Sequence, residues 1–175
     1  RRVHGGGTRS EGRERWRARD PDGVAGASEC LAPAVRPAAP EDARTCAAIL
    51  NAWIDDTPWM PRVHSRDDVF RHYREVVFPC RTVWVAGVPV VGFLAFDPES
   101  VTITALYVET PGQGFGKALM DRAKTQSDML SLWTFQANDG ARRFYAREGF
   151  WEVTRTDGEN EEGLPDVRLE WRGNA

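Results

Sequence analysis

The chain has 175 residues, of which 41% are hydrophobic and 28% are charged, and its formal net charge at pH 7 is −3. These values are typical of one soluble globular domain and exclude a chain that is disordered throughout. The acidic balance argues against nucleic acid as a partner, because phosphate binding normally needs a basic surplus. No apolar run approaches the ~18 residues of a membrane span, so we expect no membrane partner.

The cysteines indicate the compartment. Cys30, Cys46 and Cys80 are widely spaced and form no Cys-x-x-Cys pair. This usage favours a reducing environment over a disulfide framework, and it offers no metal site by spacing. No signal-peptide pattern opens the chain. We therefore expect a cytoplasmic protein without a metal, and the sequence leaves a homodimer open.

Residues 1–31 differ in composition from the rest of the chain. They contain seven arginines and five acidic residues, a net charge of +2, and almost no apolar side chain able to join a core. Gly-rich, aromatic-poor segments of this kind rarely fold alone. We expect a disordered tail at 1–31 before one domain at 32–175, and the alternative is a basic arm for an acidic partner.

From residue 34 the pattern predicts strands and helices in a mixed order. A short strand precedes two amphipathic helices; Pro40 opens the first, and a capping box of Ser65 and Asp68 opens the second, which Pro79 ends. Helices are also expected after residue 114 and after residue 138. The expected strands are 34–36, 82–86, 90–96, 101–108, 130–135, 151–155 and 167–171. The order β-α-α-β-β-β-α-β-α-β-β predicts an α/β (α+β) fold with a mixed, mainly antiparallel sheet flanked by helices.

The loop after strand 101–108 is a candidate anion site. It runs into a helix through three alternating glycines, Gly112, Gly114 and Gly116. Glycine lets backbone N–H groups approach phosphate oxygens, and the helix N-terminus adds about half a positive charge. Pro111 and Ala118 break the P-loop pattern, and Lys117 breaks the dinucleotide fingerprint. A glycine-rich turn without a ligand is the alternative.

A second segment completes a family pattern. From Asn138 to Phe150 the chain has the spacing Asn-x-x-Ala-x-x-x-Tyr-x-x-x-Gly-Phe, with Tyr145 near a helix end. Together with the glycine loop, this segment resembles the GNAT superfamily of acetyl-CoA-dependent N-acetyltransferases. The resemblance covers about residues 33–173 and implies a GNAT-like fold.

The family's pyrophosphate signature, Gln/Arg-x-x-Gly-x-Gly/Ala, fits this chain in two registers. It begins either at Gln113 or at Pro111. The first register keeps the spacing from Val108 that the family prefers. The second has Gly114-Phe115-Gly116 as its final triplet and matches the following helix better, so we prefer it.

The resemblance implies roles for several residues. In this family the strand before the glycine loop splays from its neighbour and binds the pantetheine arm of acetyl-CoA through its main chain. The Val108 N–H would then polarise the thioester carbonyl. Tyr145 would protonate the leaving thiolate, with a packed helix tyrosine as the alternative. The cofactor-binding residues implied in this way are Leu106, Tyr107, Val108, Gly112, Gln113, Gly114, Phe115, Gly116, Lys117 and Asn138, the last of which is equally well explained as a helix cap.

The binding pocket for the acceptor amine is expected between the first two helices, where Trp59, Met60 and His64 would form a partly apolar wall. A loop that only packs on the sheet is the alternative. The acidic loop 156–166 is a second candidate, although a solvated loop is the simpler interpretation. An acceptor amine with a pKa near ~10 must lose a proton before it attacks. Glu109, His64 or a water relayed through them is the candidate base.

The implied function is transfer of acetyl from acetyl-CoA to a primary amine of a small molecule or protein. Transfer would be by direct attack in a ternary complex, without a covalent enzyme intermediate. One alternative is a non-catalytic acyl-CoA-binding module with the same fold. Another is a phosphate- or nucleotide-binding protein unrelated to coenzyme A.

Overall fold

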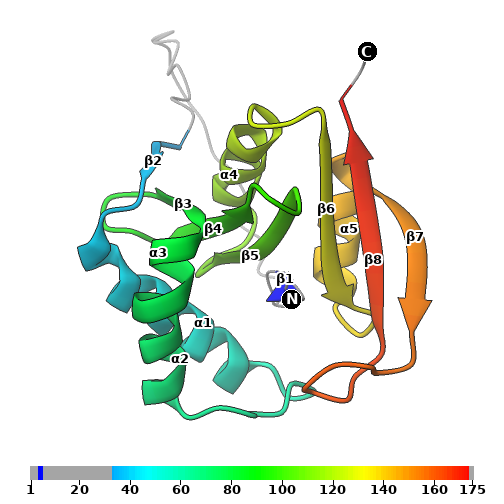
Figure 1. Cartoon of the computed structure of the whole chain (residues 1–175), viewed down its shortest axis with the longest axis horizontal. Coiled ribbons are helices and arrows are strands. Elements are labelled where there is room, and N and C mark those ends of the chain that lie inside the picture. Colours follow the sequence, from blue (N-terminus) through cyan, green and yellow to red (C-terminus); the bar gives the residue numbers. More distant parts are fainter. Residues whose placement is uncertain (1–3, 6–32, 174–175) are drawn as a thin grey trace, which may run out of the picture.

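The computed structural model describes residues 4–5 and 33–173. Its elements follow the predicted order, with one additional strand at the start (Figure 1). The strands are β1 (His4–Gly5), β2 (Val35–Pro37), β3 (Thr82–Ala86), β4 (Gly92–Asp97), β5 (Thr102–Val108), β6 (Met129–Phe135), β7 (Trp151–Thr156) and β8 (Asp166–Arg172). The helices are α1 (Ala43–Asp56), α2 (Arg66–His72), α3 (Phe78–Cys80), α4 (Phe115–Lys124) and α5 (Asp139–Arg147).

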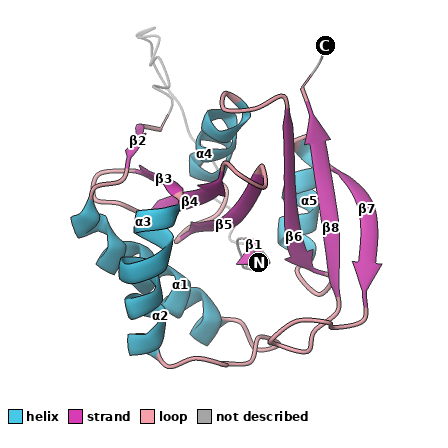
Figure 2. Cartoon of the chain, viewed as in Figure 1, coloured by secondary structure: helices cyan, strands magenta, loops and turns pink. Residues whose placement is uncertain are grey.

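The strands form one sheet in the order β2-β3-β4-β5-β6-β8-β7. All neighbours along this path are antiparallel except β5 and β6, which are parallel. Figure 2 shows the helices covering the sheet in separate groups. The predicted mixed, mainly antiparallel sheet flanked by helices is confirmed.

Strands β5 and β6 separate soon after they meet. They pair only between Thr102 and Ser131. Beyond that point β1 pairs in parallel with β5, with His4 opposite Ala105 and Gly5 opposite Leu106, and it also contacts β6 (Figure 1). Two residues of the predicted tail therefore form a strand in this gap. The other residues of 1–31 lie outside the described residues, so their disorder stays a prediction.

A bulge in β5 decides which side chains reach each face of the sheet. Ala95 lies opposite Ala105, whereas the next residue of β4, Phe96, lies opposite Ile103. The additional residue is Thr104, whose hydroxyl donates to the Ala95 carbonyl at 3.3 Å. Because a bulge shifts the alternation of side chains, Ile103 and Ala105 face opposite cores.

The sheet therefore has a hydrophobic core on each face. The first core joins α4 and α5 to the sheet and includes Leu119, Met120, Tyr145, Ile103 and Leu106. The second joins α1 and α2 to the opposite face and includes Cys46, Trp53, Val69, Ala105 and Tyr107.

The second predicted helix is continuous from Arg66 to Cys80 but contains a widened segment. Ser65 caps it, since its hydroxyl accepts a hydrogen bond from the Asp68 N–H at 3.1 Å. Residues Tyr73–Val77 between α2 and α3 form a π-helix. Such widened turns are rare in proteins, and many of those known lie at functional sites. Pro79 lies in the last turn, so the predicted end of this helix is close to the observed one.

Candidate functional site

The edge of β5 that faces the gap carries main-chain N–H groups directed away from β4. The Glu109 N–H donates to the Val91 carbonyl at 2.8 Å. Because successive N–H groups of a strand point to opposite sides, the Val108 N–H points toward the gap between β5 and β6. A carbonyl group held in this gap could accept a hydrogen bond from it. The edge is shared with β1, which pairs with β5 at Ala105 and Leu106.

The glycine loop ends directly at the N-terminus of α4. Gly112 and Gly114 both have φ of +83°, a conformation that side-chain-bearing residues rarely adopt. The Ala118 N–H donates to the Gly114 carbonyl at 3.0 Å, which makes the amides of residues 115–117 the first turn of the helix. These amides are the groups that a helix offers to an anion. Gly116 differs, because its φ is ordinary and an added Cβ would touch the Phe144 ring at 3.6 Å.

The Tyr145 side chain is fully buried in the first core, on the same face of the sheet as α4. Its ring packs against Phe144 and Phe150, with centroids 5.4 and 5.7 Å away. Its hydroxyl has no hydrogen-bond partner among the described residues. Burial raises the pKa of Tyr145 above the usual value of a phenol, so the hydroxyl stays protonated at neutral pH. A buried, unpartnered O–H is unusual and can donate to an incoming acceptor.

Asn138 is buried and caps α5. Its side-chain oxygen accepts a hydrogen bond from the Ala141 N–H at 3.1 Å. Capping accounts for an asparagine at this position. Its contact with a cofactor stays a prediction.

The opposite face of the sheet has a cavity of about 580 Å³, within the ~300–1,000 Å³ typical of small-molecule sites. It lies between α1, the Arg66–Cys80 helix and β5. Both loops named from the sequence reach it: Met60 and His64 line it from one side, and Glu161 lines it from the other. The His64 Nε2 and Glu161 Oε2 atoms are 3.1 Å apart and link the two loops at the mouth.

Two residues predicted near the acceptor lie elsewhere. Trp59 packs edge-on against Trp53 and Phe135, with both centroid distances 5.8 Å, and belongs to the second core. Glu109 is exposed just after β5 and is outside the cavity lining that the described residues form. The structure therefore brings Met60 and His64 to one cavity but does not bring Trp59 or Glu109 to it.

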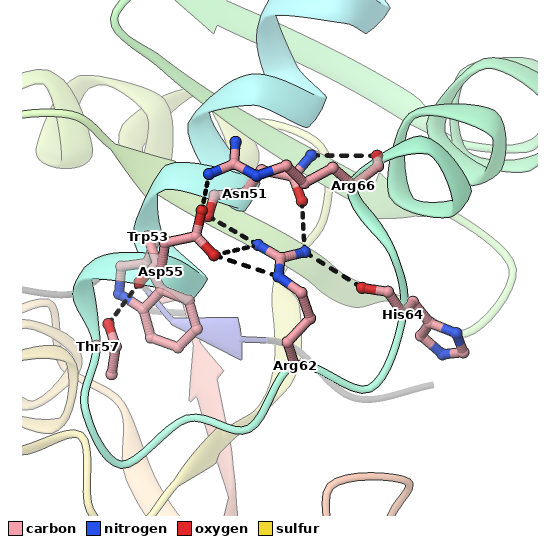
Figure 3. Close-up of polar contacts among 7 residues, drawn as sticks. All are labelled: Asn51, Trp53, Asp55, Thr57, Arg62, His64 and Arg66. Atoms are coloured by element: carbon pink, nitrogen blue, oxygen red, sulfur yellow. Dashed lines mark hydrogen bonds and ion pairs between the residues drawn. The ribbon is translucent and has the colours of Figure 1, made fainter.

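The loop between α1 and α2 is held against α1 by Arg62 (Figure 3). The Arg62 guanidinium donates to the Asp55 carboxylate at 2.6 Å and to the side-chain oxygen of Asn51 at 2.9 Å. It also donates to the His64 carbonyl at 3.2 Å. Arg66 adds an ion pair to Asp55. These contacts fix the position of the residues on either side of Arg62, which include Met60 and His64.

The acidic loop 156–166 exposes most of its carboxylates but is anchored by internal hydrogen bonds. Asp166 is buried, and its carboxylate accepts hydrogen bonds from the Thr156 hydroxyl and from the Asn160 side chain, the latter at 3.0 Å. Asn160 also bonds the Leu164 carbonyl at 2.7 Å. This framework holds Glu161 at the mouth of the cavity.

The comparisons with known proteins agree with the resemblance seen in the sequence. The family described as acetyltransferase (GNAT) domain matches residues 79–152, which include the glycine loop and Tyr145. Over this segment the chain is similar to the GNAT superfamily. A search of curated proteins found no match.

Solved structures share the GNAT fold of this chain. The apo form of YjaB from Escherichia coli superimposes with a TM-score of 0.65 and 22% identity, over 82% of this chain and 100% of that one. A GCN5-related N-acetyltransferase from Rhodopseudomonas palustris gives 0.63 and 23%, over 84% and 99%. The putative acetyltransferase yncA from Salmonella typhimurium, solved with acetyl-CoA, gives 0.62 and 19%, over 82% and 95%.

Several residues that line the cavity were not singled out from the sequence. Val69, Tyr73, Val76 and Val77 lie in the second predicted amphipathic helix, for which no role in binding was expected. Tyr73, Val76 and Val77 lie in the π-helix, and no motif in the sequence predicts a π-helix at this position. In residues 33–173, no helix is long and apolar enough to cross a membrane. The same part of the chain contains no cluster of His, Cys, Asp or Glu suited to a metal ion.

Proposed function

We propose that this protein transfers acetyl from acetyl-CoA to a primary amine. The observation that carries the proposal is the buried Tyr145 hydroxyl without a hydrogen-bond partner, on the face of the sheet that also holds the glycine loop. A fully buried unpartnered hydroxyl is costly, by about 1–3 kcal/mol. Protonation of a leaving group would explain why the Tyr145 hydroxyl is present despite this cost.

The residues of the loop and of β5 fit the proposed co-substrate. The backbone at Gly112 and Gly114, with the first turn of α4, would hold the pyrophosphate, and the final triplet Gly114-Phe115-Gly116 stands where the helix begins. Gln113 precedes these amides, and Lys117 contributes one of them. The main chain of Leu106 to Val108 would hold the pantetheine arm, which must displace β1 from the same edge.

Acetyl-CoA supplies the thioester that is attacked. The neutral amine nitrogen forms a bond to the carbonyl carbon, and the carbon–sulfur bond breaks. The Val108 N–H stabilises the negative charge that develops on the carbonyl oxygen. Tyr145 donates its proton to the departing sulfur, and the proton lost by the amine leaves through His64 or a water. The acceptor attacks directly, so no acetyl group is attached to the protein.

His64 is the better placed of the two base candidates, because it lines the cavity and Glu109 does not. Asn138 remains a candidate cofactor contact in addition to its cap. The cysteine usage of the sequence supports a cytoplasmic location.

Release of free coenzyme A thiol, measured with and without a panel of primary amines, tests the proposal. We expect release that requires both acetyl-CoA and amine. Calorimetric titration measures the binding of acetyl-CoA alongside the thiol-release assay. Tight binding without amine-dependent release would instead support a non-catalytic acyl-CoA-binding module. Stabilisation by nucleotide triphosphates but not by coenzyme A would support a nucleotide-binding protein.

A further inference from the structure

The cavity on the α1 and α2 face has an apolar interior that includes two tyrosine rings. Six of its lining residues are buried: Met60, Val69, Tyr73, Val77, Ala105 and Tyr107. The Tyr107 ring packs against Trp53 at 5.3 Å and Phe93 at 5.8 Å, and Tyr73 packs against Phe93 at 5.6 Å. Rings held by other rings form a rigid wall, which suits a hydrocarbon or aromatic ligand.

The π-helix contributes one wall of this cavity. Tyr73, Val76 and Val77 all lie in it, and all three line the space. None of the three carries a charge. The opposite wall is the bulged part of β5, where Thr104 and Ala105 face the cavity.

Three charged groups of the lining, Asp68, Glu161 and Arg81, have partners on the protein. Asp68 accepts from Ser65 at 2.8 Å and from Arg71 at 3.1 Å. Glu161 is paired with His64, and Arg81 lies 3.5 Å from Asp97. A ligand with several positive charges would have to break these pairs or place an ammonium group against the apolar wall. The second alternative is costly, whereas the exposed pairs of Asp68 and Glu161 contribute little and can be exchanged.

We propose that this cavity binds a small primary monoamine with an uncharged apolar body, such as an alkylamine or arylalkylamine. This inference rests on the proposed function, which makes the bound amine the acetyl acceptor. The apolar body packs against the π-helix and the aromatic wall. The amino group lies toward β5, the strand whose gap-facing edge would hold the thioester.

The same apolar wall helps to activate the acceptor. Desolvation disfavours the ammonium form and lowers the pKa of a bound amine. More of the amine is then neutral and able to attack at a given pH. This matters because β5 presents Thr104 and Ala105 to the cavity, and neither is a general base.

A homologous series of n-alkylamines from ethylamine to hexylamine tests the inference, because the ammonium group stays the same while the apolar body grows. With saturating acetyl-CoA, we expect kcat/KM to rise about fourfold with each methylene that the cavity covers. Spermidine, with further positive charges, should give a lower kcat/KM than hexylamine. A flat series, or a preference for spermidine or for the N-terminus of a peptide, would overturn the inference.

A cavity-filling variant tests whether the dependence of kcat/KM on alkyl chain length arises in this cavity. Val76→Trp should lower kcat/KM for hexylamine at least about tenfold, with a smaller effect on ethylamine and none on the KM of acetyl-CoA. Phe70→Trp is the control, because Phe70 is half-buried in the same helix but does not line the cavity. If Val76→Trp is folded and keeps wild-type selectivity along the series, the cavity is not the amine site.

Measurements of amine binding distinguish failure of this inference from failure of the proposed function. Should no amine be acetylated, the proposed function fails, and calorimetric titration then tests the cavity alone. Hexylamine binding that exceeds ethylamine binding and is lost in Val76→Trp would support the site. Equal or absent binding would overturn it.

Discussion

The two faces of the sheet carry the two halves of the proposed reaction, and they are built in different ways. On the α4 and α5 face, the loop glycines and Tyr145 lie in two short segments with regular spacing. On the α1 and α2 face, the cavity is lined by residues between Leu50 and Glu162 that share no motif. A site made from main-chain geometry leaves a pattern in the sequence, whereas a site made by converging side chains does not.

The largest effect is expected from Tyr145→Phe on the first face. Removing the hydroxyl takes away the proposed proton donor, so kcat should fall about ten- to a thousandfold, most steeply above neutral pH where solvent acid is scarce. The affinity for acetyl-CoA should change little. Thermal unfolding should be unchanged or slightly improved, because the hydroxyl has no partner to lose.

Thr134→Val is the matched control for this variant. Thr134 is also buried, and its hydroxyl also has no partner among the described residues. Its removal should leave kcat near the wild-type value. Equal losses in the two variants, or wild-type turnover of Tyr145→Phe from pH 6 to 9, would make Tyr145 a packing residue.

A smaller effect is expected from Gly114→Ala in the loop. A side chain at φ +83° is strained, and relief of that strain moves the amides that would hold the pyrophosphate. Calorimetric titration should show acetyl-CoA binding weakened about tenfold or more. Gly116→Ala should bind nearly normally, because its φ is ordinary and the added Cβ only touches Phe144. Unchanged affinity in folded Gly114→Ala would remove the loop from the proposed site.

On the second face, Arg62→Ala tests whether the acceptor wall must be held in place. Losing the bonds to Asn51, Asp55 and the His64 carbonyl should free the loop. We expect the KM for the amine to rise about three- to tenfold while the KM for acetyl-CoA stays constant. Arg62→Lys should recover only part of the loss, since lysine lacks the planar fork. Arg155→Ala, at an exposed pair on β7, should change neither KM.

The smallest effect is expected from removing residues 1–31. Strand β1 pairs with the edge of β5 that is proposed for the pantetheine arm, so we expect the two to compete. A two-residue strand contributes about 1 kcal/mol of net hydrogen bonding, so its removal should lower the KM for acetyl-CoA about fivefold. The melting temperature should change by less than about 5 °C. An unchanged or higher KM would mean that β1 does not compete with the cofactor.

The sequence predicted the order of elements well because local signals specify them. The short turns after β3 and β4 predicted antiparallel neighbours, and Ser65 marked the start of a helix. The bulge at Thr104, the π-helix at 73–77 and the strand β1 could not be predicted, because each depends on packing between distant segments. The role of Arg62 was also missed, since its partners lie up to 11 residues earlier in the chain and form no motif.

The most direct test of the central claim is the initial rate of thiol release from acetyl-CoA with the wild-type protein, measured against amine concentration. The proposal predicts a rate that saturates in both substrates and yields one acetylated amine per thiol released. No acetyl-protein should accumulate. A protein that binds acetyl-CoA but releases no thiol with any primary amine would contradict the account and leave an acyl-CoA-binding module in its place.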